Sequence, residues 1–315
     1  MQDLGQTRGF FSGSVKRGAR SMWQFAESLL TTVIVACVTL SAAAAQQPAI
    51  IGSPVAPGFN RPILDLRLVD IPGGLFVMGD PNPIASMPPQ WVRVERFVMM
   101  ESEVTNRMFS AFVESTGYRT DSERTGAGYV YAGAWTFING AAWLRPRGPG
   151  TSIFGLEEHP VVQVSQRDAA AFCAWARLRL PTEVEWEYAA RGNQDIRPFP
   201  WGEGIDHRFG NFGDAATALP SGFDGYIYTA PVGTYPAGQS LFGLFDMAGN
   251  VWEWTATRDT VVQGHVIMRG GGWGNDFRAQ QVTAATNAAI NIGMDMVGFR
   301  CAGSLVAGSI SSTIR

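Results

Sequence analysis

Lysine is almost absent from this chain of 315 residues: Lys16 is the only one, and every other basic residue is arginine. Schiff-base and P-loop lysine chemistry are therefore excluded beyond residue 45. Charge is also scarce, at 16% of residues. Residues 46–315 hold 20 basic and 25 acidic side chains, a net charge of −5. This mildly acidic body argues against electrostatic binding of nucleic acid or anionic lipid.

The N-terminal segment is predicted to be either a secretory signal or a membrane anchor. Residues 1–21 are polar and basic, and the strongest apolar run spans residues 29–45 and ends in four alanines before Gln46. This pattern is typical of a secretory signal cleaved after Ala45. The alternative is an uncleaved membrane helix within residues 22–45, and a lipoprotein box at Cys37 is a third interpretation. All three place the rest of the chain on the periplasmic side of the cytoplasmic membrane.

Cysteine is rare as well, with three residues in all. Beyond Cys37 only Cys173 and Cys301 remain, an even pair in an exported chain. An oxidising compartment favours a disulfide between them, and two buried free thiols are the alternative.

The apolar pattern divides the remaining chain. Residues 46–62 contain four prolines and predict an extended linker. Residues 63–303 carry a core pattern, and residues 304–315 form a tail. Short strands are expected within residues 64–78 and 92–100. Capping residues predict helices from Thr105 to Gly117, from Ser165 to before Pro181, and from Thr182 to Gly192.

Helical periodicity disappears between residues 193 and 301, where Gly, Asn, Asp, Trp and Phe dominate. So many aromatic residues predict irregular backbone packed around buried rings. Such backbone leaves peptide groups that need partners, and bound cations are one solution.

Ordered motifs along this part resemble the formylglycine-generating enzyme (sulfatase-modifying factor) family. They are residues 71–79 (IPGGLFVMG), 103–106 (EVTN), 159–165 (HPVVQVS), 179–189 (RLPTEVEWEYA), 200–202 (PWG), 243–254 (GLFDMAGNVWEW), 269–273 (RGGGW) and 298–301 (GFRC). The resemblance covers about residues 63–303. It implies an α+β, C-type-lectin-like sulfatase-modifying-factor fold with little regular secondary structure. An N-terminal apolar helix would precede that fold.

The resemblance also implies two structural calcium sites and a disulfide. One site would use the side chains of Asp246 and Glu253 with the carbonyls of Gly249 and Val251. The other would use the side chains of Asn211 and Asp224 with the carbonyls of Phe212 and Tyr226. Oxygen donors of this kind suit calcium, whereas lone carboxylates more often cap turns. Cys173 and Cys301 occupy the positions of the family's structural disulfide.

The catalytic part departs from the family. Formylglycine generators hold copper(I) on two cysteines and use it to oxidise a substrate cysteine with oxygen. Here the two cysteine positions are Asn275 and Gln280, and the family's serine position is Gly272. Amide side chains do not hold copper(I) tightly, because that ion requires soft thiolates. Neither copper nor formylglycine generation is expected.

Other chemistry has weaker support in the sequence. His159, His207 and His265 are far apart along the chain, which leaves a two-histidine, one-carboxylate iron site as a minor alternative. Three glutamates alternate at a predicted helix start, at residues 183, 185 and 187. Helix capping is a simpler role for them than general acid–base catalysis.

These observations predict a non-catalytic exported binding or structural module. We expect a protein partner, such as a membrane complex for electron transport or photosynthesis to which the chain is an accessory subunit, and no nucleic acid. The resemblance places residues 275–291 along the exposed groove of the fold, where they are expected to be either the binding region or a solvated loop. The alternative function is an oxidase or protein-maturation enzyme with a metal centre other than the two-cysteine copper site.

Overall fold

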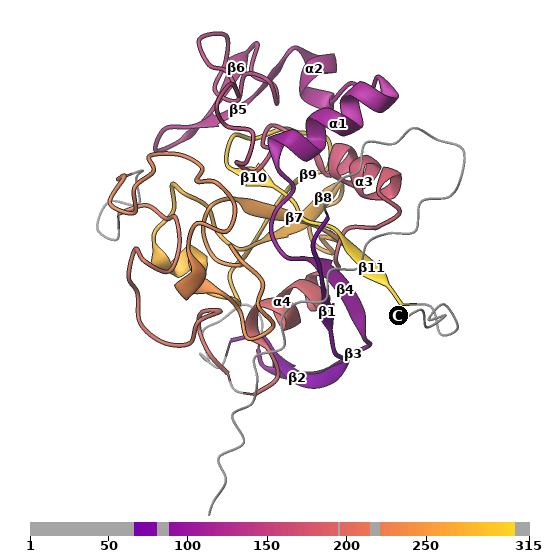
Figure 1. Ribbon diagram of the computed structural model, residues 1–315, viewed down its shortest axis with the longest axis vertical. Helices are drawn as coiled ribbons and strands as arrows, with labels where there is room; N and C mark the ends of the chain where they lie inside the picture. Colours follow the sequence, from indigo (N-terminus) through magenta and orange to yellow (C-terminus); the bar gives the residue numbers. More distant parts are fainter. Residues whose placement is uncertain (1–65, 81–87, 195, 215–220, 306–315) are drawn as a thin grey trace, which may run out of the picture. The chain divides into compact units, whose positions relative to one another are not determined.

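The computed structural model describes residues 66–80, 88–194, 196–214 and 221–305 (Figure 1). The predicted signal or anchor, the linker and all but the start of the tail lie outside these residues. None of the helices in these ranges has the length and apolar character needed to cross a bilayer.

The first sheet joins the two ends of the described chain. Strand β4 (Phe97–Met100) lies between β1 (Leu68–Ile71) and β11 (Ala302–Ser304), and both pairings are antiparallel. All four residues of β4 are buried. The short strands expected within residues 64–78 are present as β1 and a second strand, but these two do not pair with each other. Strand β2 (Gly74–Met78) instead pairs with β3 (Gln90–Val94).

The three predicted helices are confirmed. They could be predicted from the sequence because capping residues act on the neighbouring turn of the chain. Helix α1 (Asn106–Thr116) begins after Thr105 and ends at Gly117, which has a left-handed backbone. Helices α3 (Gln166–Trp175) and α4 (Glu183–Arg191) both begin with a complete capping box. A further short helix, α2 (Asp121–Thr125), also begins with one, but its five residues leave little periodicity to detect.

The stretch predicted to be irregular contains a four-stranded sheet. Its order is β10 (Val297–Gly298), β7 (Trp252–Arg258), β8 (His265–Arg269) and β9 (Ala285–Ala289). Two 3-10 turns, η1 (Pro236–Gly238) and η2 (Phe277–Gln280), lie between longer irregular segments. Strand β7 reads WEWTATR and does alternate apolar and polar residues, but Glu253 and Thr255 are buried as well as the two tryptophans, so the alternation does not mark a solvent-facing side. A second unpredicted feature is the hairpin of β5 (Ala127–Tyr131) and β6 (Trp135–Asn139).

The predicted disulfide between Cys173 and Cys301 is present, with a Cα–Cα distance of 5.6 Å. It links α3 to the chain that enters β11 and lies in a buried cluster with Phe109, Phe172 and Phe299. The bridge therefore fixes the C-terminal strand to the helical layer.

Candidate functional site

Asn275 and Gln280, the two residues predicted to stand at the family's cysteine positions, lie in a turn that follows β8, and both side chains are amides. The Asn275 carboxamide oxygen accepts a hydrogen bond of 2.8 Å from Trp252 Nε1. The side chain of Gln280 is buried, and its Nε2 lies 3.3–3.4 Å from the carbonyl oxygens of Gly272, Asn275 and Asp276. The Gln280 amide therefore bonds within its own turn, whereas the Asn275 amide joins the turn to β7. Soft thiolate ligation of copper(I) has no donor here.

The family serine position is closed by packing. A Cβ atom on Gly272 would lie 2.4 Å from Met296 Cγ, and one on Gly274 would lie 2.8 Å from the Tyr131 ring. A Cβ on Gly271, whose φ is +70°, would lie 2.3 Å from Gln280 Oε1. Larger residues at these three positions therefore require their neighbours to move.

An aromatic and charged cluster borders this turn. The Arg147 guanidinium lies 4.2 Å from the centroid of the Tyr228 ring, and Tyr228 meets Trp273 edge-on at 5.1 Å. Arg147 also pairs with Asp295, whose carboxylate accepts the Tyr131 backbone N–H. Burial raises the pKa of Asp295 to about 7, and the nearby Arg147 charge opposes that shift.

The predicted calcium ligands Asn211 and Asp224 lie close together. Asp224 accepts hydrogen bonds from the backbone N–H groups of Phe212 at 2.9 Å and Tyr226 at 3.0 Å, the two residues whose carbonyls complete the predicted set. Burial raises the pKa of Asp224. The buried Asn211 Oδ1 atom has no hydrogen-bond partner. This free buried oxygen beside a buried carboxylate fits a calcium ion, which is ligated by hard oxygens.

The other predicted set has a different environment. Both Glu253 carboxylate oxygens accept hydrogen bonds from Arg300, at 2.7–3.0 Å, and one also accepts from Trp186 Nε1 at 2.9 Å. Asp246 accepts the Gly233 backbone N–H at 2.7 Å. These bonds satisfy the Glu253 carboxylate within the protein, so this set fits a cation less well than the set around Asn211.

Two buried side chains that the sequence did not single out complete this region. Glu103 accepts hydrogen bonds from Asn250 Nδ2 and the Val251 N–H. Burial raises the pKa of Glu103 well above its usual value, and repulsion from Asp246 and Glu253 adds to the shift. Arg300 is fully buried among these carboxylates. Glu103 belongs to the motif at residues 103–106 and Arg300 to the motif at residues 298–301. No pattern within either motif indicates that the two side chains lie in the same buried region.

The three histidines contact different partners. His159 Nδ1 lies 2.9 Å from Thr229 Oγ1, His265 Nδ1 lies 2.7 Å from Asn287 Oδ1, and His207 stacks on Phe212. Across the described ranges, no group of three or more His, Cys, Asp or Glu side chains is arranged to hold a metal.

The three alternating glutamates have structural partners. Glu185 completes the α4 capping box, and Glu183 and Glu187 pair with the buried Arg269.

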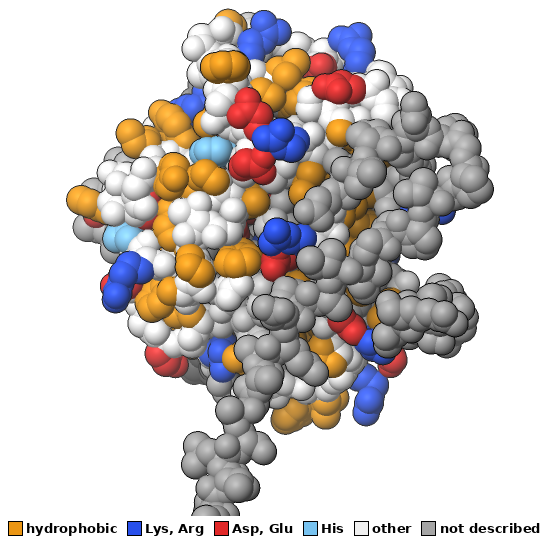
Figure 2. Space-filling model, viewed as in Figure 1, with side chains coloured by type: hydrophobic (Ala, Val, Ile, Leu, Met, Phe, Trp, Pro, Cys, Tyr) orange, Lys and Arg blue, Asp and Glu red, His pale blue; other side chains and the backbone are white. Residues whose placement is uncertain are grey.

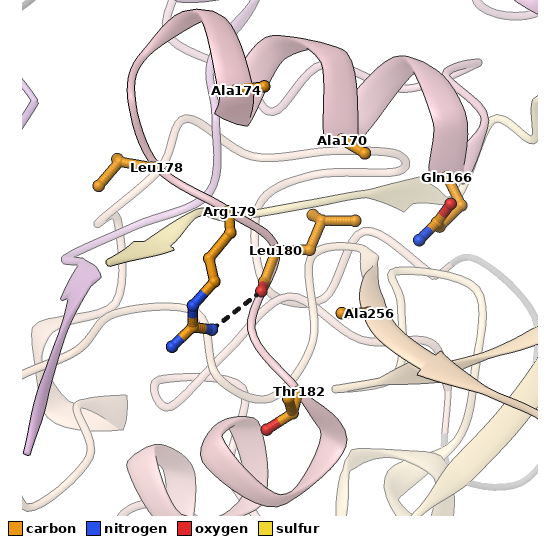
Figure 3. Close-up of a pocket in the computed structure, with 8 residues that line it drawn as sticks. All are labelled: Gln166, Ala170, Ala174, Leu178, Arg179, Leu180, Thr182 and Ala256. Carbon is orange, nitrogen blue, oxygen red and sulfur yellow. Dashed lines mark hydrogen bonds between the residues drawn. The ribbon is translucent and has the colours of Figure 1, made fainter. Parts of the chain in front are cut away.

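A hollow of about 340 Å³ lies elsewhere, between α3, the segment that leads into α4, and β7 (Figure 3). Its lining is mostly apolar, and the Arg179 guanidinium pairs with Glu185. The hollow is lined by Gln166, Ala170, Ala174, Leu178, Arg179, Leu180, Thr182 and Ala256. None of these side chains is a nucleophile or a general base, so we assign it no chemistry.

Comparisons with known proteins agree with the motifs. Residues 64–305 match the family described as the sulfatase-modifying factor enzyme 1-like domain. The chain is 38% identical over 235 residues to a formylglycine-generating enzyme of Mus musculus, covering 65% of this chain and 63% of that enzyme. The chain thus spans less than two thirds of that relative.

Two further matches are informative. An inactive C-alpha-formylglycine-generating enzyme 2 of Mus musculus is 35% identical over 269 residues, covering 76% of this chain and 86% of the relative. The solved structure of PvdO from Pseudomonas aeruginosa matches with a TM-score of 0.59 and 27% identity, covering 76% of this chain and 94% of PvdO. The mixed α and β architecture, with few helices, is therefore shared.

Proposed function

Because the chain belongs to the sulfatase-modifying factor enzyme 1-like family, we propose that it is a non-catalytic binding or structural module of that family. The observation that carries this proposal is the buried Gln280 amide. Gln280 is predicted from the sequence to stand at a copper-ligand position of the family, and its amide contacts three backbone carbonyl oxygens of its own turn. The two cysteines of the described ranges are joined to each other, so neither supplies a thiolate.

A binding role is supported by the surface next to this turn. Tyr228 is exposed there and meets the buried Trp273 edge-on, and Trp273 in turn contacts Tyr131. Aromatic side chains of this kind contribute large contact areas to protein interfaces. The similarity to a relative named as inactive supports the same conclusion.

The module is proposed to work outside the cytoplasm, as an accessory subunit on a membrane complex. The support is in the sequence: a basic start, an apolar run of residues 29–45 and an alanine-rich exit. Calcium at the Asn211 and Asp224 set is proposed as a structural cofactor, where it would satisfy the free Asn211 Oδ1 atom.

The test has two parts. Purified full-length protein is incubated with copper(I) and oxygen, together with a sulfatase-type peptide that carries the target cysteine. The peptide is then analysed by mass spectrometry. We expect no aldehyde and no bound copper, and conversion of the cysteine contradicts the proposal. Bound copper or iron with oxygen uptake supports the alternative oxidase function. A gentle detergent pull-down from the native membrane then identifies the partner complex.

A further inference from the structure

The β5–β6 hairpin is an exposed and uncharged edge of the fold (Figure 1). Residues 126–144 contain no charged side chain. In the described part of the chain, β6 pairs with β5 alone, so its other side is open. Proteins usually protect such an edge with charges, proline or a covering segment. Strand β6 has no such residue, although it exposes Phe137 to 55% and Trp135 to 38%.

The hydrogen bonds of β5 show which groups of β6 face the open side. The Tyr129 N–H donates to the Gly293 carbonyl, and its own carbonyl accepts from the Asp295 N–H, so both groups point away from β6. Tyr129 is opposite Phe137. In an antiparallel pair, two directly opposed residues that do not hydrogen-bond to each other both point their backbone N–H and C=O groups away from the partner strand. The Phe137 N–H and C=O therefore face the open side.

The same rule applies one pair further along the hairpin. The Tyr131 N–H donates to Asp295 Oδ1 and its carbonyl accepts from Arg147, so Trp135, opposite Tyr131, also turns its backbone groups outward. By the same alternation, Asn139 does so as well.

The side chains of these residues form an aromatic ladder, which we define as Tyr129, Tyr131, Trp135 and Phe137. The ring centroids of Tyr129 and Phe137 are 5.2 Å apart, and those of Tyr131 and Trp135 are also 5.2 Å apart. Tyr131 contacts Trp273, so the ladder is continuous with the cluster next to the altered copper positions. Backbone groups and apolar contact area are therefore presented along one edge.

We propose that the open edge of β6 binds an extended peptide segment of a partner protein as an added strand. The backbone of the segment would bond to the outward groups of Trp135, Phe137 and Asn139, and its alternate side chains would lie on the aromatic ladder. Because the hairpin carries no charge, the side chains it accepts are apolar or aromatic. A peptide is favoured over a sugar because only a peptide backbone repeats donors and acceptors in register with the outward groups of β6. This inference rests on the proposed binding function and names its ligand class.

Phage-displayed random peptides selected on the purified full-length protein test this proposal. We expect enriched peptides to alternate apolar residues and to bind the wild-type chain. Asn139→Pro removes one outward N–H, whereas Asn139→Ala keeps it. The proline variant should weaken peptide binding by about tenfold, the equivalent of one or two hydrogen bonds, and the alanine variant should not. Phe137→Lys places a charge on the aromatic ladder and should abolish peptide binding.

Trp91→Ala is the matched control, because Trp91 is 71% exposed on β3, outside the hairpin. Circular dichroism must show that each variant is folded, and Phe137→Lys keeps the test valid if the proline variant is not. Failure to enrich any peptide overturns the proposal, as does equal binding to the wild type and both edge variants. Ladder-dependent binding on a glycan array, or self-association that Phe137→Lys removes, assigns the edge to a sugar or a second copy and also overturns it. If the membrane partner still binds the edge variants, the edge proposal fails while the binding function stands.

Discussion

Met296 occupies the space that a side chain at position 272 would need: a Cβ on Gly272 would lie 2.4 Å from Met296 Cγ and 3.0 Å from its sulfur. The relationship joins a residue after β8 to one just before β10, in a buried region. A side chain at position 272 and the Met296 side chain therefore compete for the same space.

Introducing the serine alone should destabilise the protein. Gly272→Ser forces Met296 to move, and overpacking of this kind costs about 1–3 kcal/mol. Combining it with Met296→Ala should show a favourable coupling of roughly 0.5–3 kcal/mol relative to the sum of the single variants. Urea denaturation of the wild type, the two single variants and the double variant measures the destabilisation and the coupling. Strictly additive effects would show that the two sites do not compete for space.

Introducing two thiolates at positions 275 and 280 should give the protein copper(I) binding while Gly272 stays unchanged. The variant Asn275→Cys with Gln280→Cys places two soft ligands in one turn, and we expect it to bind copper(I) where the wild type does not. The serine pair at the same positions is the control for side-chain size. Copper is measured by competition with a chromogenic chelator. Equal copper binding by the serine and cysteine pairs would contradict thiolate ligation at this turn.

The disulfide should contribute strongly to stability. It closes a loop with a sequence separation of 128 residues. The chain-entropy estimate for so long a loop is about 4–5 kcal/mol. Replacing both Cys173 and Cys301 with alanine should lower the free energy of unfolding by a similar amount, measured in guanidinium chloride. A wild-type protein whose midpoint does not change with reductant would mean that the bond is not formed.

Calcium should stabilise the chain through the Asn211 and Asp224 set. A ligand at about 100 times its dissociation constant adds roughly 2.7 kcal/mol to the free energy of unfolding. Asp224→Asn should remove most of that increment, whereas Asp259→Asn, which changes an exposed carboxylate on the β7–β8 connection, should not. Thermal melts with calcium and with chelator give the comparison. Identical calcium shifts in both variants would rule out this set as the site.

Stability should fall as the pH rises towards neutrality, in part because of Asp295. The pKa of Asp295 is about 7 in the folded state, against an ordinary value of 3.8. Folded protein therefore keeps a proton that unfolded chain has lost, so the contribution is complete below pH 3.8 and is lost as the pH passes 7. Its size is on the order of 4 kcal/mol. Asp295→Asn removes this titration.

The measurement for Asp295 is the free energy of unfolding at a series of pH values. Between about pH 4 and pH 7 the wild type should lose stability more steeply than Asp295→Asn. Parallel curves for the two proteins would show that Asp295 has the same pKa in the folded and unfolded chains.

Local chemistry in the sequence was sufficient for the family, the three longer helices and the cysteine pair. Caps such as Thr105 and Gly117 act within a few residues, and the motif strings are contiguous, so neither needs the fold to be known.

Only the tertiary structure decided where the amides point, what fills the serine position and which strand edge stays open. Gln280 contacts the carbonyl of Gly272 eight residues away, Arg300 meets Glu253 across 47 residues, and Tyr131 bonds to Asp295 across 164. The strands of the second half also escaped detection: β7 alternates along its sequence, but its buried residues include the polar Glu253 and Thr255, which only the packing explains. Contacts between distant residues depend on how the elements pack, and no periodicity within one segment records them.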